Sequence, residues 1–293
     1  MEGPARHIGR ERAIPLRQGA ERRLAQAGTT APRVGPQEEP VSTGGTRLAL
    51  KAALAGLLAA AATPAGATAQ ERLTRELVLA ALKDATPDHP ADFTGRDLSG
   101  LDLSGIDFKR ANLSRCRLVG TKLAKAQLFS VTLSDAMATG ADLSGANLDV
   151  AVMYRVDMRH AILRDASLFA TIADDGDFSD ADLTRARIVS PMSHATFARA
   201  KLTQANLGAD PGNQSMGVMR TDATGADFTG ADLSGANLRK ALMIRADLTG
   251  ADLTDAEVSG ADLTGAILRN IRGRERIRGL DRALHVDQAV FND

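Results

Sequence analysis

From Ala91 onward the chain repeats a five-residue unit, and this period fits neither standard element of secondary structure. On an α-helix, five residues rotate the chain by about 140°, so the apolar residues would spiral around every face. On a continuous strand, an odd spacing would send them to opposite faces in turn. Within each unit, Ala, then Asp or Asn, then Leu follow the in, out, in alternation of a short strand, and Ser or Thr with Gly follows as a turn. Each unit therefore predicts one short extended segment and a corner.

The repeat comprises 34 units, in the ranges 91–190, 195–209 and 216–270. The central residue is apolar in all 34 units, and the residue two positions before it is Ala in 23 of them. A large and a small side chain pointing inward from every side would fill a narrow core, whereas the charged residues would point outward.

Units such as Ala141–Gly145 and Ala231–Gly235, both ADLSG, resemble the signature A-(D/N)-L-x-x of the pentapeptide-repeat family. The resemblance implies an all-β solenoid, a right-handed quadrilateral β-helix with four repeats per coil. Residues 91–270 would then form about nine coils, stacked about 4.8 Å apart. Each coil would contact only its neighbours.

Both ends of the repeat need a cap, because an open coil presents unpaired backbone groups. Residues 70–90 predict a short N-terminal capping helix and a linker, with an apolar stripe over Glu71–Asp84. Residues 271–293 depart from the pattern and predict an irregular C-terminal cap. Two phase slips, Pro191–His194 and the insertion Asp210–Ser215, predict loops or bulges on the side of the solenoid.

The part of the chain before Gln70 is a different kind of segment. Residues 41–69 contain Arg47 and Lys51, an uncharged run and the triplet Ala67-Thr68-Ala69, which is the order of a secretory signal peptide cleaved before Gln70. Residues 1–40 are rich in Arg, Gly and Pro, so they predict either a disordered extension or sequence upstream of the true start. The signal predicts a periplasmic or secreted protein; the alternative is an Ala-rich cytosolic helix.

Two charge clusters stand out as candidate interaction surfaces. A run of closely spaced carboxylates would suit Ca²⁺ or a basic partner, and a basic cluster near the C-terminus would suit the phosphate groups of envelope lipids or another polyanion. The alternative for each cluster is a solvated face. The acidic cluster consists of Asp174, Asp175, Asp177, Asp180 and Asp182, and the basic cluster of Arg272, Arg274, Arg276 and Arg278.

The sequence offers no support for catalysis, a metal or a cofactor. The single cysteine, Cys116, occupies a small inward position and predicts a packing role, and the five His residues lack metal-ligand spacing. A whole-chain net charge of zero and 3% aromatic residues give no reason to expect nucleic-acid binding.

These observations together predict a non-catalytic, exported rod that acts as a protein-binding or structural module in the bacterial envelope, with an unknown protein or envelope component as its partner. The mature chain contains no predicted transmembrane segment, and its oligomeric state stays open. The alternative, implied by the family resemblance, is a cytosolic DNA mimic that binds DNA gyrase or another topoisomerase. Such a mimic needs a continuous acidic surface, whereas with four repeats per coil the outward column Asp102, Lys122, Asp142, Ile162, Asp182 is interrupted twice.

Overall fold

The computed structural model describes residues 73–210 and 219–291. The predicted extension 1–40, the predicted signal peptide 41–69 and the predicted mature N-terminus at Gln70 lie outside the described residues. The chain divides into two compact units, Met1–Gly45 and Thr46–Asp293, and every described residue belongs to the second.

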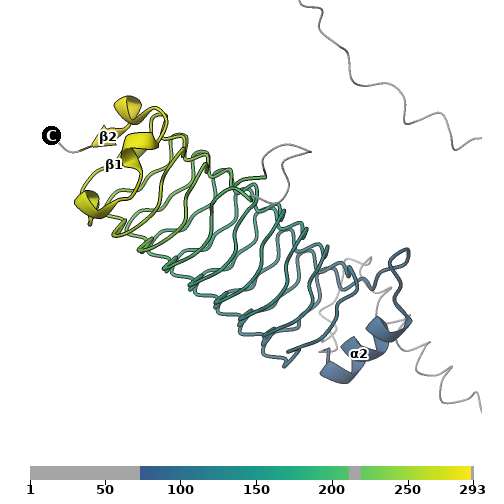
Figure 1. Cartoon of the computed structure of the whole chain (residues 1–293). Coiled ribbons are helices and arrows are strands. Elements are labelled where there is room, and N and C mark those ends of the chain that lie inside the picture. Colours follow the sequence, from purple (N-terminus) through teal and green to yellow (C-terminus); the bar gives the residue numbers. More distant parts are fainter. Residues whose placement is uncertain (1–72, 211–218, 292–293) are drawn as a thin grey trace, which may run out of the picture. The chain divides into compact units, whose positions relative to one another are not determined.

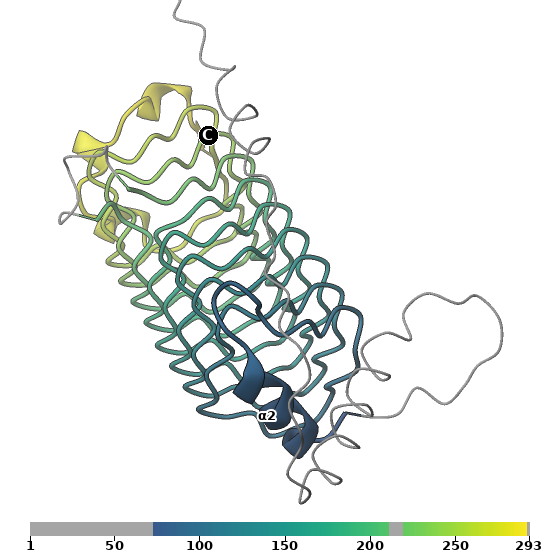
Figure 2. The ribbon, with the colours of Figure 1, turned by 90° about the vertical axis from the view of Figure 1, so that its right-hand side faces the viewer.

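Stacked coils of extended backbone form the described repeat region (Figures 1 and 2). Parallel β-bridges join Asp102 to Lys122 and Lys122 to Asp142, so four repeats close one coil. Each bridge consists of paired backbone hydrogen bonds: Leu103 N donates to Lys122 O over 2.7 Å, and Lys122 N donates to Leu101 O over 2.9 Å. The short extended segments predicted from the five-residue period, and the β-helical solenoid implied by the family resemblance, are therefore present.

The four sides of a coil are named here after the first described coil: side A begins at 91, side B at 96, side C at 101 and side D at 106. Each corner follows the two turn residues of a side. The second turn residue adopts a left-handed conformation, with φ of +63° at Gly145, which explains why Gly is frequent there. The Asp of the unit fixes the turn, since Asp142 Oδ1 accepts hydrogen bonds from Ser144 N at 3.0 Å and Ser144 Oγ at 2.6 Å.

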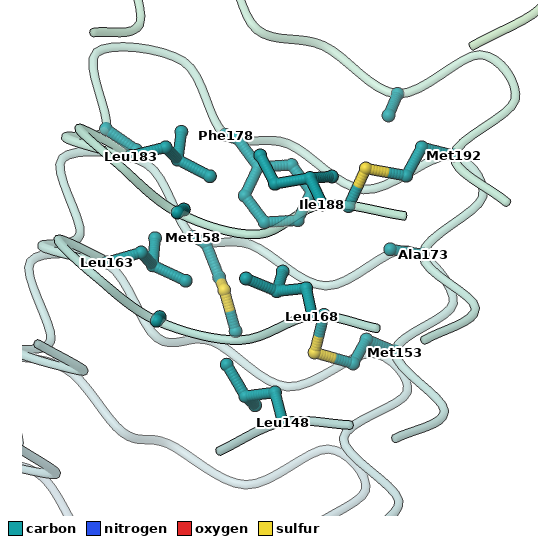
Figure 3. Close-up of a cluster of buried hydrophobic side chains, with 14 of the residues drawn as sticks. Leu148, Met153, Met158, Leu163, Leu168, Ala173, Phe178, Leu183, Ile188 and Met192 are labelled. Atoms are coloured by element: carbon teal, nitrogen blue, oxygen red, sulfur yellow. The ribbon is translucent and has the colours of Figure 1, made fainter. Parts of the chain in front are cut away.

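Large central side chains from all four sides meet on the axis of the solenoid (Figure 3). One coil places Met153 and Met158 in the core, and the next coil places Ala173 and Phe178 at the same two positions. A smaller and a larger side chain together therefore fill the space that two methionines fill one coil earlier. On side B the rings of Phe178, Phe197 and Phe228 stack with centroids 5.0 and 4.9 Å apart.

Three polar side chains at the small inward position find a partner on the preceding coil. Thr121 Oγ1 donates to Leu98 O and Thr171 Oγ1 donates to Leu148 O, both over 2.9 Å. Cys116 Sγ makes the same contact with Phe93 O at 2.8 Å, and burial raises the pKa of its thiol to about 12. The packing role predicted for Cys116 therefore agrees with its surroundings.

Helix α2 (Arg75–Asp84) lies at the N-terminal end of the described coils, within the range predicted as a capping helix, although Glu71 lies outside the described residues (Figure 1). Thr74 caps it by accepting a hydrogen bond from Leu77 N at 3.4 Å. Its Val78 and Leu82 are buried in the core cluster. Among the described residues, no helix is long and apolar enough to cross a membrane.

The first phase slip is not the loop that the sequence predicted. Pro191 takes the bridging position of a complete side, where it pairs with Asp222, and Met192 is fully buried at the centre. Ser190 fills the inward position of this side, so the missing residue comes from the preceding turn, which Val189 makes alone. Pro191 O still accepts from Ala173 N at 3.0 Å, whereas proline lacks the N–H with which Ile172 bonds to Ala151 O one coil earlier.

The second interruption is longer than predicted. Pro191 pairs with Asp222, whereas the ordinary period of the coils would pair it with position 211, so the excursion extends beyond the predicted insertion Asp210–Ser215. The unit predicted at 216–220 falls mostly outside the described residues, and Thr221 is the first residue of the next side A. Residues 211–218 lie outside the described residues.

The C-terminal segment is regular, which corrects the predicted irregular cap. Its bridging residues are Arg272, Arg278, Leu284 and Val290, which recur with a period of six instead of five and pair with successive sides of the preceding coil. The extra residue lengthens the connection after each bridging residue, and this connection contains a short 3₁₀ turn. The elements are β1 (Ile267–Leu268), η2 (Arg274–Arg276), η3 (Leu280–Arg282), η4 (Val286–Gln288) and β2 (Val290–Phe291), with β1 and β2 parallel.

Two glycines explain how this terminal coil closes. Gly273 and Gly279 stand where a repeat ordinarily places its central Leu, and they adopt left-handed φ values of +70° and +73°. A Cβ on Gly273 would lie 2.6 Å from Thr254 Cα. The backbone can therefore turn tightly against the preceding coil and bring Leu280 and Val286 against the end of the core.

Candidate interaction surfaces

Side chains of the solenoid itself satisfy most of the acidic cluster predicted as an interaction surface. Asp174 Oδ1 accepts from Ser193 N at 2.8 Å, and Asp177 Oδ1 accepts from Ser179 N at 2.9 Å. Both contacts fix turns. These two carboxylates therefore have a structural role that the sequence did not reveal.

The next two carboxylates of the acidic cluster pair with arginines one coil away. Asp180 forms a two-pronged pair with Arg199 (2.9 and 2.7 Å), and the hydrogen bond from that guanidinium lowers the pKa of the Asp180 carboxyl. Asp182 pairs with Arg164 at 2.7 Å; burial alone would raise its pKa, but hydrogen bonds from Arg164 and Thr184 make the pKa lower than usual. Within the described residues, no group of His, Cys, Asp or Glu is arranged to hold a metal ion.

The C-terminal basic cluster likewise binds the preceding coil. Arg272 pairs with Asp252 at 3.3 Å, Arg276 pairs with the Asp255 carboxylate, and Arg278 Nη2 donates to Asp255 O at 2.8 Å. The guanidinium of the fourth residue, Arg274, lies 4.3 Å from the centre of the Phe291 ring. These contacts fasten the terminal coil to the solenoid.

An alternating series of charges follows the A–B corner, and we call it the charge ladder: Arg115, Asp135, Arg155 and Asp175, one per coil. Arg155 Nε and Nη2 donate to the two oxygens of Asp135 at 2.7 and 2.9 Å. This hydrogen bonding and the positive charges of Arg155 and Arg115 lower the pKa of the Asp135 carboxyl. The hydrogen bond to Asp135 and the negative charge of Asp135 raise the pKa of Arg155, and the charge of Asp175 acts in the same direction.

The D–A corner carries an apolar turn residue on each of three successive coils. Phe129 is 46% exposed and Val150 is 43% exposed, and Phe169 follows on the next coil. These three residues are called the apolar corner. The adjoining bridging positions of side A carry Val152 and Ile172, so the apolar surface continues onto that side. This surface was not predicted from the sequence, although the recurrence of apolar residues about once per coil at this corner was a visible signal.

Val150 has a backbone conformation that disfavours it. Its φ is +61°, in the left-handed region, and β-branched residues are rare there. At the same position of other turns Gly is frequent, for example Gly145. Backbone strain of this kind is common at functional sites. The stability of the fold gives no reason for a β-branched residue at position 150, so Val150 suggests a functional role for this corner.

The long excursion leaves the solenoid at the same corner. Arg187 anchors its first described residue, since Arg187 Nη2 lies 3.0 Å from Asp210 Oδ2. The same guanidinium lies 3.9 Å above the centre of the Phe169 ring. The apolar corner and the excursion are therefore joined through one side chain.

A shallow hollow between α2 and the first coil is the remaining candidate surface of the described residues. Its apolar wall includes Leu79 and Leu82, and its cations are Arg75, Lys83 and Lys109. Arg75 Nη1 already donates to Asp102 O, and Lys109 Nζ donates to Leu82 O at 2.9 Å. Two of its three cations therefore hold the helix in place.

Comparison with known proteins agrees with this architecture. The family model for pentapeptide repeats matches eight copies, at residues 91–124, 126–165, 219–239 and 231–270. Members of that family form right-handed β-helices. Stacked repeats that each contact only their neighbours define a class of solenoid repeat proteins. The chain belongs to the pentapeptide-repeat family.

Solved structures of this family resemble the chain to different extents. HetL of Nostoc sp. strain PCC 7120, involved in heterocyst differentiation regulation, is 32% identical over 60% of this chain and 84% of its own, with a TM-score of 0.42. A protein of the Arabidopsis thaliana thylakoid lumen is 33% identical over 32% of this chain and 65% of its own, with a TM-score of 0.31. Full-length QnrB1, a plasmid-mediated fluoroquinolone resistance protein, is 17% identical over 67% of this chain and 94% of its own, with a TM-score of 0.28. A search of the curated proteins found no match.

Proposed function

We propose that this pentapeptide-repeat chain is a non-catalytic binding module of the bacterial envelope, exported through the signal peptide at residues 41–69. In this proposal the scaffold is a β-helix of about nine coils, closed by α2 at one end and by the terminal coil of period six at the other. The module recognises another protein through the outside of its coils.

The apolar corner is the observation that carries this proposal. The charged side chains of both predicted clusters are largely engaged by neighbouring coils, which leaves little of their hydrogen-bonding capacity for a ligand. Phe129 and Val150 instead expose apolar surface at turn positions that many other units fill with Ser, Thr or Gly. Exposed apolar side chains gathered on one surface are typical of protein–protein interaction sites.

The topoisomerase-binding alternative has less support. The bridges show that Asp102, Lys122, Asp142, Ile162 and Asp182 do form one column, so the acidic surface is interrupted as the sequence predicted. A basic and an apolar side chain in that column weaken any imitation of the evenly spaced phosphates of DNA.

Fractionation of the native host tests the envelope part of the proposal. The intact mass of the protein is measured in each compartment, and we expect a periplasmic species that begins at Gln70. A cytosolic species that retains residues 41–69 would contradict export and restore the topoisomerase-binding alternative.

Photocrosslinking in cells tests the binding part. A benzophenone amino acid replaces Phe129, and the matched control replaces Thr139, a turn residue on side B at the diagonally opposite B–C corner. We expect protein adducts from position 129 and none from position 139. The absence of adducts at both positions would contradict the choice of surface.

A further inference from the structure

We propose that side A, bordered by the apolar corner and the charge ladder, is a self-complementary interface that pairs two copies of this chain in antiparallel orientation. This inference rests on the proposed function, because it uses the apolar corner as a binding surface, and it names the partner: a second copy of the chain. The pairing requires a two-fold axis that lies in the interface and runs perpendicular to the axis of the coils.

The apolar corner is symmetric about its middle residue. Phe129 precedes Val150 by about one coil and Phe169 follows it by about one coil. A two-fold axis at the height of Val150 therefore places Phe129 against Phe169 of the second copy, and Val150 against its own equivalent. The exposed Phe129 and Val150 and the half-buried Phe169 would leave water together.

The charge ladder is complementary to itself under the same operation. When the second copy is reversed, Arg115 faces Asp175 of that copy. The Asp135–Arg155 ion pair formed within each copy faces the same pair of the other copy, with Asp135 opposite Arg155. The midpoint of the ladder falls about a quarter of a coil from Val150, which corresponds to about 1 Å at a coil spacing of about 4.8 Å. One axis therefore satisfies both borders of side A.

Only this register and orientation suit both borders. A shift by one coil would place Arg opposite Arg and Asp opposite Asp along the ladder, because the sign alternates at every coil. Parallel pairing would place the apolar corner of each copy against the ladder of the other, so it would bury charges against apolar side chains. The alternating ladder thus disfavours the wrong arrangements as well as favouring the right one.

The interface is small, and this sets the expected affinity. The matched features span about four coils of one side, so the buried area falls below about 1,200 Å² in total, a size typical of transient association. We therefore expect a dissociation constant in the micromolar range. The central part of side A contributes Val152 and Ile172, which add apolar contact between the two borders.

Sedimentation equilibrium of the chain purified from its host tests the proposal, at concentrations from about 1 to 500 μM to span the expected micromolar range. We expect the average mass to rise from one copy toward two. Arg155→Glu places three consecutive negative charges in the ladder, so we expect weaker dimerisation, with a dissociation constant at least tenfold higher than that of the wild type. A matched control is Arg185→Glu, which breaks an equivalent pair with Asp165 (2.7 and 2.6 Å) on the C–D corner and should leave dimerisation unchanged.

A charge exchange provides the decisive rescue. In the double variant Asp135→Arg with Arg155→Asp, the two positions still face each other across the axis with opposite charges, so dimerisation should return to within about threefold of wild type. The proposal is overturned if wild type stays monomeric, if Arg155→Glu and Arg185→Glu have equal effects, or if the exchange fails to restore dimerisation. Adducts from position 129 to other proteins, together with a monomeric wild type, would reject this inference and leave the proposed function intact. Thermal unfolding confirms that each variant is folded.

Discussion

Val156 and Gly176 occupy the same inward position on successive coils of side B, and the missing side chain of Gly176 makes room for its neighbours. A Cβ on Gly176 would lie 3.4 Å from Val156 Cγ1, 2.9 Å from the Phe178 ring and 3.0 Å from Ala173 O. Most other units carry Ala here, so this glycine reflects local packing and not the repeat pattern.

Gly176→Ala should therefore destabilise the protein, although Ala fits almost every other inward position. Overpacking of a close-packed core typically costs about 1–3 kcal/mol. Adding Val156→Ala should recover only part of the loss, because the Phe178 ring and the Ala173 carbonyl stay where they are. Urea unfolding of the two variants measures both effects, and full recovery in the double variant would show that Val156 alone limits the space.

Stability should fall as the solution becomes acidic. Hydrogen bonds from Arg155, Arg185 and Arg199 lower the pKa of the Asp135, Asp165 and Asp180 carboxyls. A carboxyl whose pKa is lower in the folded state stabilises the fold above its unfolded pKa of about 4, and this contribution disappears as pH falls through the folded value. The melting temperature should therefore hold near neutral pH and decrease below about pH 4.

The triple variant Asp135→Asn, Asp165→Asn, Asp180→Asn tests the origin of that decrease. Thermal unfolding between neutral pH and about pH 2 should show a shallower decrease for the triple variant than for wild type. Asp88→Asn, in the segment before the first repeat, is the control and should leave the slope unchanged. An identical slope in the triple variant would assign the acid sensitivity to other groups.

Cys116 should be inert in the folded protein. Burial raises the pKa of its thiol to about 12, so the reactive thiolate is scarce near neutral pH. A thiol-specific reagent followed by mass spectrometry should modify the chain only after denaturant is added. Rapid labelling under native conditions would mean that the first coils open readily.

The β-helix could be predicted from the sequence because its pattern is local. The inward Leu, the Ala two positions before it and the turn residues recur in every unit, and side-chain contacts between coils only stack what each unit already specifies. The first interruption was placed wrongly because the missing residue belongs to the turn at Val189, whereas the break in the pattern becomes visible only at Pro191.

The surfaces were harder to predict, because the residues that pair with their charged side chains lie about one coil away in the sequence. Asp180 looks like part of an acidic run, and its partner Arg199 becomes apparent only once the coils are aligned. The terminal coil escaped prediction for a different reason: Gly273 and Gly279 replace the central Leu, so the inward apolar signal disappears just where the period changes to six.

Gly273 should be indispensable to the terminal coil. Gly273→Ala combines left-handed strain with a clash against Thr254, whereas Gly250→Ala introduces the same kind of strain (φ +69°) with no atom within 4 Å of the new Cβ. We expect Gly250→Ala to cost about 1–2 kcal/mol and Gly273→Ala to cost clearly more. Hydrogen exchange should show the extra loss of protection in residues 271–291, and equal costs would show that the terminal coil moves aside.

Val150→Gly should stabilise the solenoid while it weakens the proposed dimer. Left-handed backbone costs a residue with a side chain about 1–2 kcal/mol, and glycine gives back part of that gain through the extra freedom of its unfolded state, so we expect a net increase of about 1 kcal/mol in the free energy of unfolding. Ser130→Gly, at the same corner with φ +57°, is the control without β-branching and should gain less. Urea unfolding at a concentration that keeps the chain monomeric measures the stability, and sedimentation equilibrium measures the association. Opposite changes in the two quantities would show that Val150 is kept at the expense of stability, whereas a loss of both would mean that its side chain mainly packs against its own coil.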